Sequence, residues 1–359
     1  MKRILLLFLL VFQLMVNAQP FLTGHRSVTF FDASRLLRPV TAELYYPGAT
    51  ANDNVVVVPG ITKFPVVCFG HGFLTAATTY KWLADSLVKN GYIVVLPTTE
   101  GSAFPSQPQL ALDMAFLCST IIAQNDSATS FLYGRVLKRS AVGGHSMGGG
   151  CSFLAMTYNT SINAIFNYAA AETIPSAKDA ATTIQKPGLF LAGSLDCIVP
   201  DSNELRMYNN IPYPCKTYVN FTGGLHCHFC RNDFGCVFGQ VSSGCNTSSL
   251  TYQVVEQKTI ALLVPFLNYY LKDSCNSKSI FETVYNNMTG VTKQRVCTAD
   301  PLGCTEYTFT GDGNWDVTSN WLNNKIPPDT LPANGKIIIN PVINGECVVN
   351  INQVISPGA

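Results

Sequence analysis

Short, continuous runs of apolar residues recur through the first three-quarters of the chain. Runs of this length without polar alternation are typical of strands buried on both faces of a parallel sheet. Between them, apolar residues at helical spacing predict helices near residues 80–89, 110–123 and 250–272. The runs that predict buried strands lie at residues 64–69, 92–97, 164–168, 188–192 and 216–221, after an opening hairpin at 27–31 and 41–47. This alternation predicts an α/β fold with a mostly parallel central sheet flanked by helices.

The pattern changes after about residue 272. A polar, cysteine-bearing stretch follows, and then a segment with strand-like patterning that is rich in Asn and Gly. We therefore expect one α/β domain at residues 19–273, a connector at 274–304 and a β-rich accessory module at 305–359. The module has few strands with which to close a core, so we expect it to be incomplete.

The N-terminus has the pattern of a secretory signal peptide. Lys2 and Arg3 precede an apolar run at residues 4–12, and Val16-Asn17-Ala18 offers a small-residue cleavage site. The apolar run is short for a membrane span, and no later run is long enough for one. Residues 1–18 are thus predicted to be removed, and the protein to be secreted without a membrane span.

Composition narrows the choice of partners. The net charge is +1, and charged residues are only 13% of the chain, which gives no indication of a nucleic-acid partner. Thirteen cysteines in an exported protein are expected mostly as disulfides, and an odd total leaves at least one unpaired within the chain. Cys68, inside an apolar strand, is a candidate for a buried free thiol.

Gly144-x-Ser146-x-Gly148 stands between an apolar run and a helical pattern, which is the context of a nucleophile elbow. The tight turn excludes side chains two positions before and after the serine. It also directs N–H groups of the following helix towards a developing oxyanion.

A serine nucleophile needs a base, and the base needs an acid that orients it. Asp196 directly follows a predicted strand and is the favoured acid, with Asp201 as the alternative. His226 follows the last predicted strand and is the favoured base, with His228 two positions on. These loops are expected at the carboxyl edge of the sheet, beside Ser146.

The same stretch allows a metal site. Cys227, His228, Cys230 and Cys236 could bind zinc. Because export favours disulfides, we expect no metal there.

Two N–H donors are needed for an oxyanion hole, and Met147 and Phe73 are the candidates. His71 and His145, beside these positions, are expected to be structural.

Four motifs now follow in the order found in one superfamily: Gly70-His71-Gly72-Phe73, Gly144-His145-Ser146-Met147-Gly148-Gly149, Gly193-Ser194-Leu195-Asp196 and Gly224-Leu225-His226-Cys227. With them, the chain from about residue 27 to 272 resembles the α/β-hydrolases, and within these the dienelactone-hydrolase, chlorophyllase and PET-hydrolase (cutinase)-like group. The resemblance implies an acyl-enzyme mechanism without metal or organic cofactor.

The resemblance also implies a role for each matching residue. Ser146 would be the nucleophile, Asp196 the orienting acid, His226 the base, and Phe73 and Met147 the oxyanion donors. The loop at residues 169–175 departs from PET hydrolases and cutinases in having no tryptophan.

The tail from about residue 308 resembles the Gly-x-Gly-x-Trp openings of β-rich modules on secreted Bacteroidetes proteins. This resemblance implies a module of β-solenoid type that contacts a cell surface or polymer.

The function predicted is therefore a secreted serine esterase acting on carboxylic esters, aryl or polymeric esters included. The alternatives are a lipid acetylhydrolase or peptidase with the same triad, or an inactive hydrolase fold that serves binding or adhesion. We expect a monomer. An apolar acyl pocket is predicted to be lined by Phe73, Met147, Leu74, Ala170 and Ile198.

Overall fold

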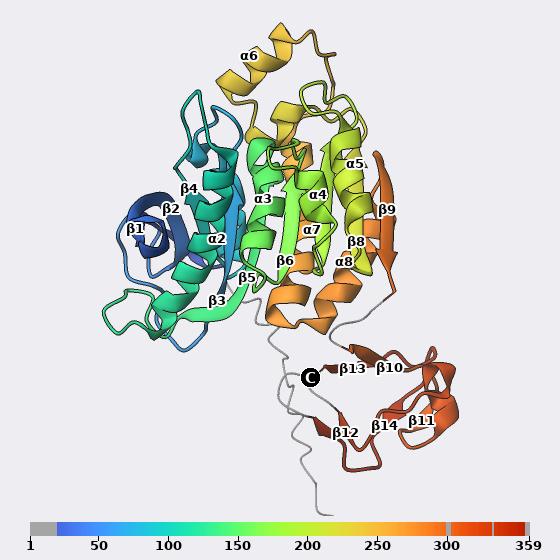
Figure 1. Ribbon diagram of the computed structural model, residues 1–359. Coiled ribbons are helices and arrows are strands. Elements are labelled where there is room, and N and C mark those ends of the chain that lie inside the picture. The colour runs from blue at the N-terminus through green and yellow to red at the C-terminus, as the bar shows by residue number, and fades with distance from the viewer. Residues whose placement is uncertain (1–19, 299–302, 332–333, 356–359) are drawn as a thin grey trace, which may run out of the picture.

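The computed structural model describes residues 20–298, 303–331 and 334–355, so the predicted signal peptide lies outside the described residues. A sheet of nine strands in the order β1-β2-β4-β3-β5-β6-β7-β8-β9 forms the centre of the larger domain (Figure 1). The strands are β1 (Leu22–Asp32), β2 (Arg38–Gly48), β3 (Phe64–Gly70), β4 (Ile93–Pro97), β5 (Val136–His145), β6 (Ala164–Tyr168), β7 (Gly188–Gly193), β8 (Cys215–Phe221) and β9 (Val291–Cys297).

Strands β3 to β8 pair in parallel, whereas β1, β2 and β9 join the edges in antiparallel pairs. All residues of β3 and β4 are buried, as continuous apolar runs predict. The predicted mostly parallel α/β fold is confirmed.

Helices cover both faces of the sheet. The helices are α1 (Lys81–Lys89), α2 (Gln107–Ala123), α3 (Met147–Tyr158), α4 (Ala177–Ala181), α5 (Asp201–Asn210), α6 (Phe234–Ser242), α7 (Tyr252–Lys272) and α8 (Cys275–Asn287). Because side chains alternate along a strand, β3 divides its residues between two cores. Val66 and Cys68 belong to the core that includes residues of α2, α3, α4 and α5, while Val67 and Phe69 belong to the core that includes residues of α1, α7 and α8. Helix α6 differs from the others because none of its residues is buried.

The connector differs from the expectation. Helix α8 packs against α7 through Phe281, and β9 pairs with β8 along its whole length, so residues up to about 297 belong to the larger domain. The sequence pattern missed β9 because this edge strand alternates intermediate and exposed positions and carries polar residues.

The C-terminal module is β-rich, as expected. Its strands pair in parallel across about thirty residues of sequence, β10 with β13, β11 with β14 and β12 with β15, which makes two successive coils of a solenoid. Phe309, Trp315 and Trp321 form its small core. The strands are β10 (Thr305–Phe309), β11 (Gly313–Asn314), β12 (Thr330–Leu331), β13 (Gly335–Ile339), β14 (Cys347–Val348) and β15 (Val354–Ile355).

Disulfides are present, as the cysteine content predicts. They join Cys197 to Cys245, Cys215 to Cys297, Cys227 to Cys236 and Cys275 to Cys304. Cys68 is a buried free thiol, as expected. None of the helices in the described ranges is long and apolar enough to cross a membrane.

Candidate active site

Ser146 occupies the turn between β5 and α3, as the motif predicts. Its φ of 55° and ψ of −120° are strained for a residue with a side chain. The turn is held by the Ser146 N–H, which donates to the carbonyl oxygen of Tyr168 (3.0 Å). A Cβ on Gly144 would lie 2.2 Å from the carbonyl of Gly148, so a side chain there would break the turn.

The predicted acid and base lie in direct contact. The Nδ1–H of His226 donates to Oδ2 of Asp196 at 2.7 Å, and both side chains are almost completely buried. The other oxygen, Oδ1, accepts the N–H groups of Ile198 (3.0 Å) and Val199 (2.8 Å). These two bonds fix the carboxylate, so the ring of His226 has a defined orientation.

The alternative acid and base have other partners. Oδ2 of Asp201 accepts the side-chain N–H of Asn220 at 2.6 Å. Nδ1 of His228 accepts the N–H of Leu225 at 3.2 Å, and burial lowers the pKa of this imidazole. The geometry therefore favours Asp196 and His226 over both alternatives.

Ser146 and His226 open into one cavity of about 130 Å³. Its wall consists of Gly72, Phe73, Thr75, His145, Ser146, Ile198, His226, Gly235, Cys236 and Gly239. Of the predicted pocket residues, Phe73 and Ile198 line this cavity. Leu74 lines a neighbouring cavity beside His71, and Ala170 is completely buried, so the predicted place of Ala170 in the pocket wall is wrong.

The predicted oxyanion donors lie at the ends of two secondary-structure elements. Met147 is the first residue of α3, where an N–H has no acceptor within the helix. Phe73 follows β3, and the N–H of the preceding Gly72 is engaged by the hydroxyl of Tyr80 (3.1 Å). The N–H of Phe73, the next residue, remains the candidate donor from that loop.

The two other histidines at the site are buried. Nδ1 of His145 accepts the hydroxyl proton of Tyr80 at 2.8 Å, and its ring centroid lies 4.5 Å from that of His226. Burial, and then the neighbouring His226, lower the pKa of His145 well below its usual range, so the ring is neutral. His71 places its two ring nitrogens 2.9 Å from the carbonyl oxygens of Gly72 and Thr99. These contacts agree with structural roles.

Glu204, on α5, was not anticipated from the sequence. It is completely buried, and one carboxyl oxygen accepts the N–H of Ala170. The next residue, Ala171, donates its N–H to the carbonyl of Ser146 (2.9 Å). Burial, and then the charge of Asp196, raise the pKa of Glu204 to about 8, despite the bond from Ala170. Nothing in the local sequence marks it, since it lies on an otherwise ordinary helix.

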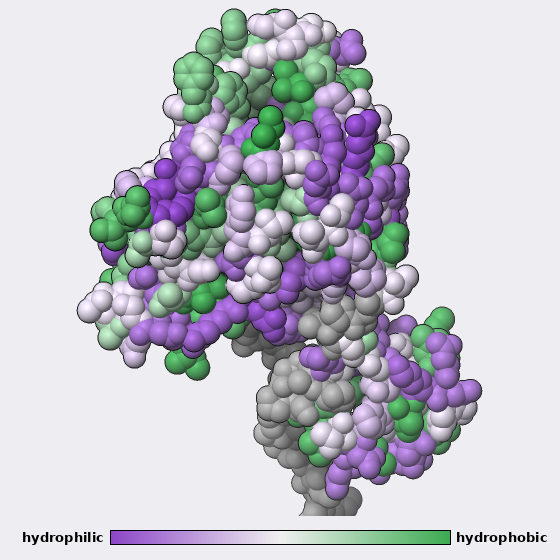
Figure 2. Space-filling model, in the orientation of Figure 1, coloured by the Kyte–Doolittle hydropathy of each residue, from purple (hydrophilic) through white to green (hydrophobic). Residues whose placement is uncertain are grey.

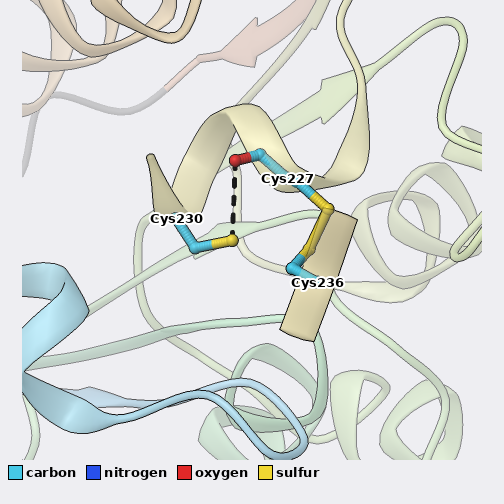
Figure 3. Close-up of side chains that lie close together, drawn as sticks. All are labelled: Cys227, Cys230 and Cys236. Carbon is cyan, nitrogen blue, oxygen red and sulfur yellow. Dashed lines mark hydrogen bonds between the residues drawn. A yellow bond between two sulfur atoms is a disulfide. The ribbon is translucent and has the colours of Figure 1, made fainter. Parts of the chain in front are cut away.

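Three cysteines lie beside the predicted base, with their sulfur atoms within 4.8 Å of one another (Figure 3). Cys227 and Cys236 share a disulfide, and the thiol of Cys230 donates to the carbonyl of Cys227 at 3.5 Å. Burial raises the pKa of Cys230 to about 12. Zinc requires thiolates, so this oxidised, protonated set does not fit it.

An elbow serine at the carboxyl edge of a parallel sheet, with loops from β7 and β8 meeting beside it, defines the α/β-hydrolase class of protein. Residues 22–243 match the PET hydrolase-like (PETase) family, and this chain belongs to that family. Ester hydrolysis is the class of activity that goes with this membership. No curated protein matches the chain.

Proposed function

We propose that the protein is a secreted serine esterase that hydrolyses carboxylic esters through Ser146, His226 and Asp196. The contact between Asp196 and His226, directed into the cavity that also contains Ser146, is the observation that supports this most strongly. It supplies the oriented base that a serine hydroxyl needs.

In the proposed mechanism, Oγ of Ser146 attacks the ester carbonyl carbon while Nε2 of His226 takes its proton. Asp196 stabilises the imidazolium that forms. The N–H groups of Phe73 and Met147 bind the oxyanion of the tetrahedral intermediate. His226 then protonates the leaving alcohol, which departs from the acyl-enzyme. Water, activated by His226, releases the acid and restores Ser146.

Apolar side chains at the mouth of the cavity support aryl or polymeric esters as substrates. Phe73 is 49% exposed and Ile198 is 36% exposed, and both line the cavity. Exposed apolar side chains beside a reactive serine favour substrates that present an apolar surface.

Secretion is supported by two independent features. Residues 1–18 have the pattern of a signal peptide, and four disulfides require an oxidising compartment. The C-terminal module is proposed to contact a cell surface or polymer outside the cell.

The test is hydrolysis of p-nitrophenyl esters from acetate to palmitate by the wild type and by Ser146→Ala. We expect activity in the wild type and a loss of about 10⁵-fold or more in the variant, because removal of the nucleophile leaves only binding and oxyanion stabilisation. A fluorophosphonate probe should add to Ser146, as peptide mass spectrometry would show. An unlabelled, inactive wild type would instead favour a hydrolase fold that serves binding.

A further inference from the structure

Residues 234–245, here called the cap segment, contain α6 and follow the His226 loop. In Figure 1, α6 stands at the top of the molecule, above the carboxyl ends of the parallel strands. None of the nine residues of this helix is fully buried, and only Cys236 and Val237 of its side chains pack partly against the core.

Two disulfides also hold the cap segment. Cys236, on α6, is bonded to Cys227, the residue after His226. Cys245, at the other end, is bonded to Cys197, the residue after Asp196. The cap segment is thus fixed at both ends to the loops that carry the proposed base and acid, and it is not a freely moving lid.

The two faces of α6 have different side chains. Phe234, Phe238 and Val241 are 85%, 66% and 71% exposed, and Figure 2 shows hydrophobic residues gathered at the top of the molecule. Gly235 and Gly239, one helical turn apart, line the cavity that contains Ser146 and His226.

Glycine weakens a helix by about 1 kcal/mol relative to alanine, so two glycines in α6 do not serve helix stability. A Cβ on Gly239 would have no heavy atom within 4 Å. Packing therefore does not require glycine at this position, which lines the cavity.

We propose that the cap segment determines which esters the enzyme accepts, with Gly239 as the specificity-determining residue. This inference rests on the proposed function. The glycine face leaves room for the substituent of the ester beside Ser146, and a side chain at residue 239 fills that room. Because both ends of the segment are tied down, the wall cannot retreat to make way for a longer substrate.

The test compares the wild type, Gly239→Ala and Gly239→Leu on two ester series. One series varies the acyl chain of p-nitrophenyl esters, and the other varies the alcohol of alkyl acetates. We expect Gly239→Leu to lower kcat/KM for the longest substrates roughly tenfold or more relative to the shortest, with Gly239→Ala intermediate. Phe238→Leu, the neighbouring change on the outward face, is the matched control and should leave the chain-length profile unchanged.

The inference would be overturned if kcat/KM of Gly239→Leu depended on chain length as in the wild type in both series, or fell by the same factor at every length. The proposed function would still stand in either case. If Gly239→Leu fails to fold, Gly239→Ala decides, because alanine favours the helix. Failure of the proposed function looks different, since the wild type itself would then hydrolyse neither series. That outcome would overturn both.

Discussion

Ser146 adopts a backbone conformation that costs about 1–3 kcal/mol for a residue with a side chain. The turn is held in this conformation by close packing against β3. Only glycine fits there, since a Cβ on Gly148 would lie 2.2 Å from the carbonyl oxygen of Gly70. At this scale the sequence was informative. The spacing of Gly144, Ser146 and Gly148 has a direct steric reason, and the structure has the turn where the motif predicts it.

Glu204 provides a test by pH. Its pKa in the folded protein is about 8, raised from 4.5 mainly by burial. The folded state therefore holds a proton that the unfolded state loses, and stability falls as pH rises from about 4.5 to about 8. Across this pH range, Glu204 lowers the free energy of unfolding by an amount on the order of a few kcal/mol. We expect Glu204→Gln to abolish this decline, as thermal unfolding measured between pH 5 and 8.5 would show.

Glu282→Gln is the control for this prediction, because that carboxylate lies on α8 with its side chain 40% exposed. It should retain the decline seen in the wild type. An equally steep decline in Glu204→Gln would mean that Glu204 is not the group responsible.

At the scale of elements, the cap segment could be seen in the sequence only as a cysteine-rich stretch without charged residues. The pairing of its cysteines could not be deduced from a sequence with thirteen of them, because even the eight that pair allow about 105 connectivities. Its position over the cavity depends on Cys227–Cys236 and Cys197–Cys245, which join segments 9 and 48 residues apart.

The second of these disulfides can be removed in a controlled way. We expect Cys197→Ser/Cys245→Ser to lose stability, by about 4 kcal/mol on the chain-entropy account of a loop of this length. It should also lose about tenfold or more in kcat/KM for ester hydrolysis, because the loop of Asp196 and the Cys245 end of the cap segment lose their shared tie. Denaturant unfolding and steady-state kinetics measure the two effects.

The matched control is Cys275→Ser/Cys304→Ser, which removes a disulfide of sequence separation 29 away from the cavity. It should lower stability by a similar amount, about 3.6 kcal/mol, and leave kcat/KM unchanged. Equal kinetic losses in both variants would show that the effect on catalysis comes from general destabilisation.

At the scale of the whole molecule, the candidate site and the solenoid module lie at opposite ends (Figure 1). The module is tied to the larger domain by the disulfide Cys275–Cys304, and Sγ of Cys275 lies 3.3 Å from the carbonyl oxygen of Asn334. None of its described residues lines the cavity that contains Ser146.

A chain that ends at Thr298, with Cys275→Ser to avoid a free thiol, should therefore keep its activity on soluble esters. Changes at distant sites usually affect each other's free energies by no more than about 0.5 kcal/mol. We therefore expect the kcat/KM of the truncated chain to lie within about twofold of that of the full chain. A large loss in a truncated chain whose circular dichroism remains native would assign the module a part in catalysis.

The α/β class, the elbow and the order of the motifs could be predicted from the sequence, because apolar periodicity and glycine spacing act locally along the chain. The sequence also indicated Asp196 and His226, since each directly follows a buried strand. Only the tertiary structure showed that His226 contacts Asp196, whereas Asp201 and His228 have other partners, because this depends on where each side chain points. It also placed Ala170 beneath the surface against Glu204, and the cap segment over the cavity. These depend on contacts between residues far apart in the chain, which no local pattern encodes.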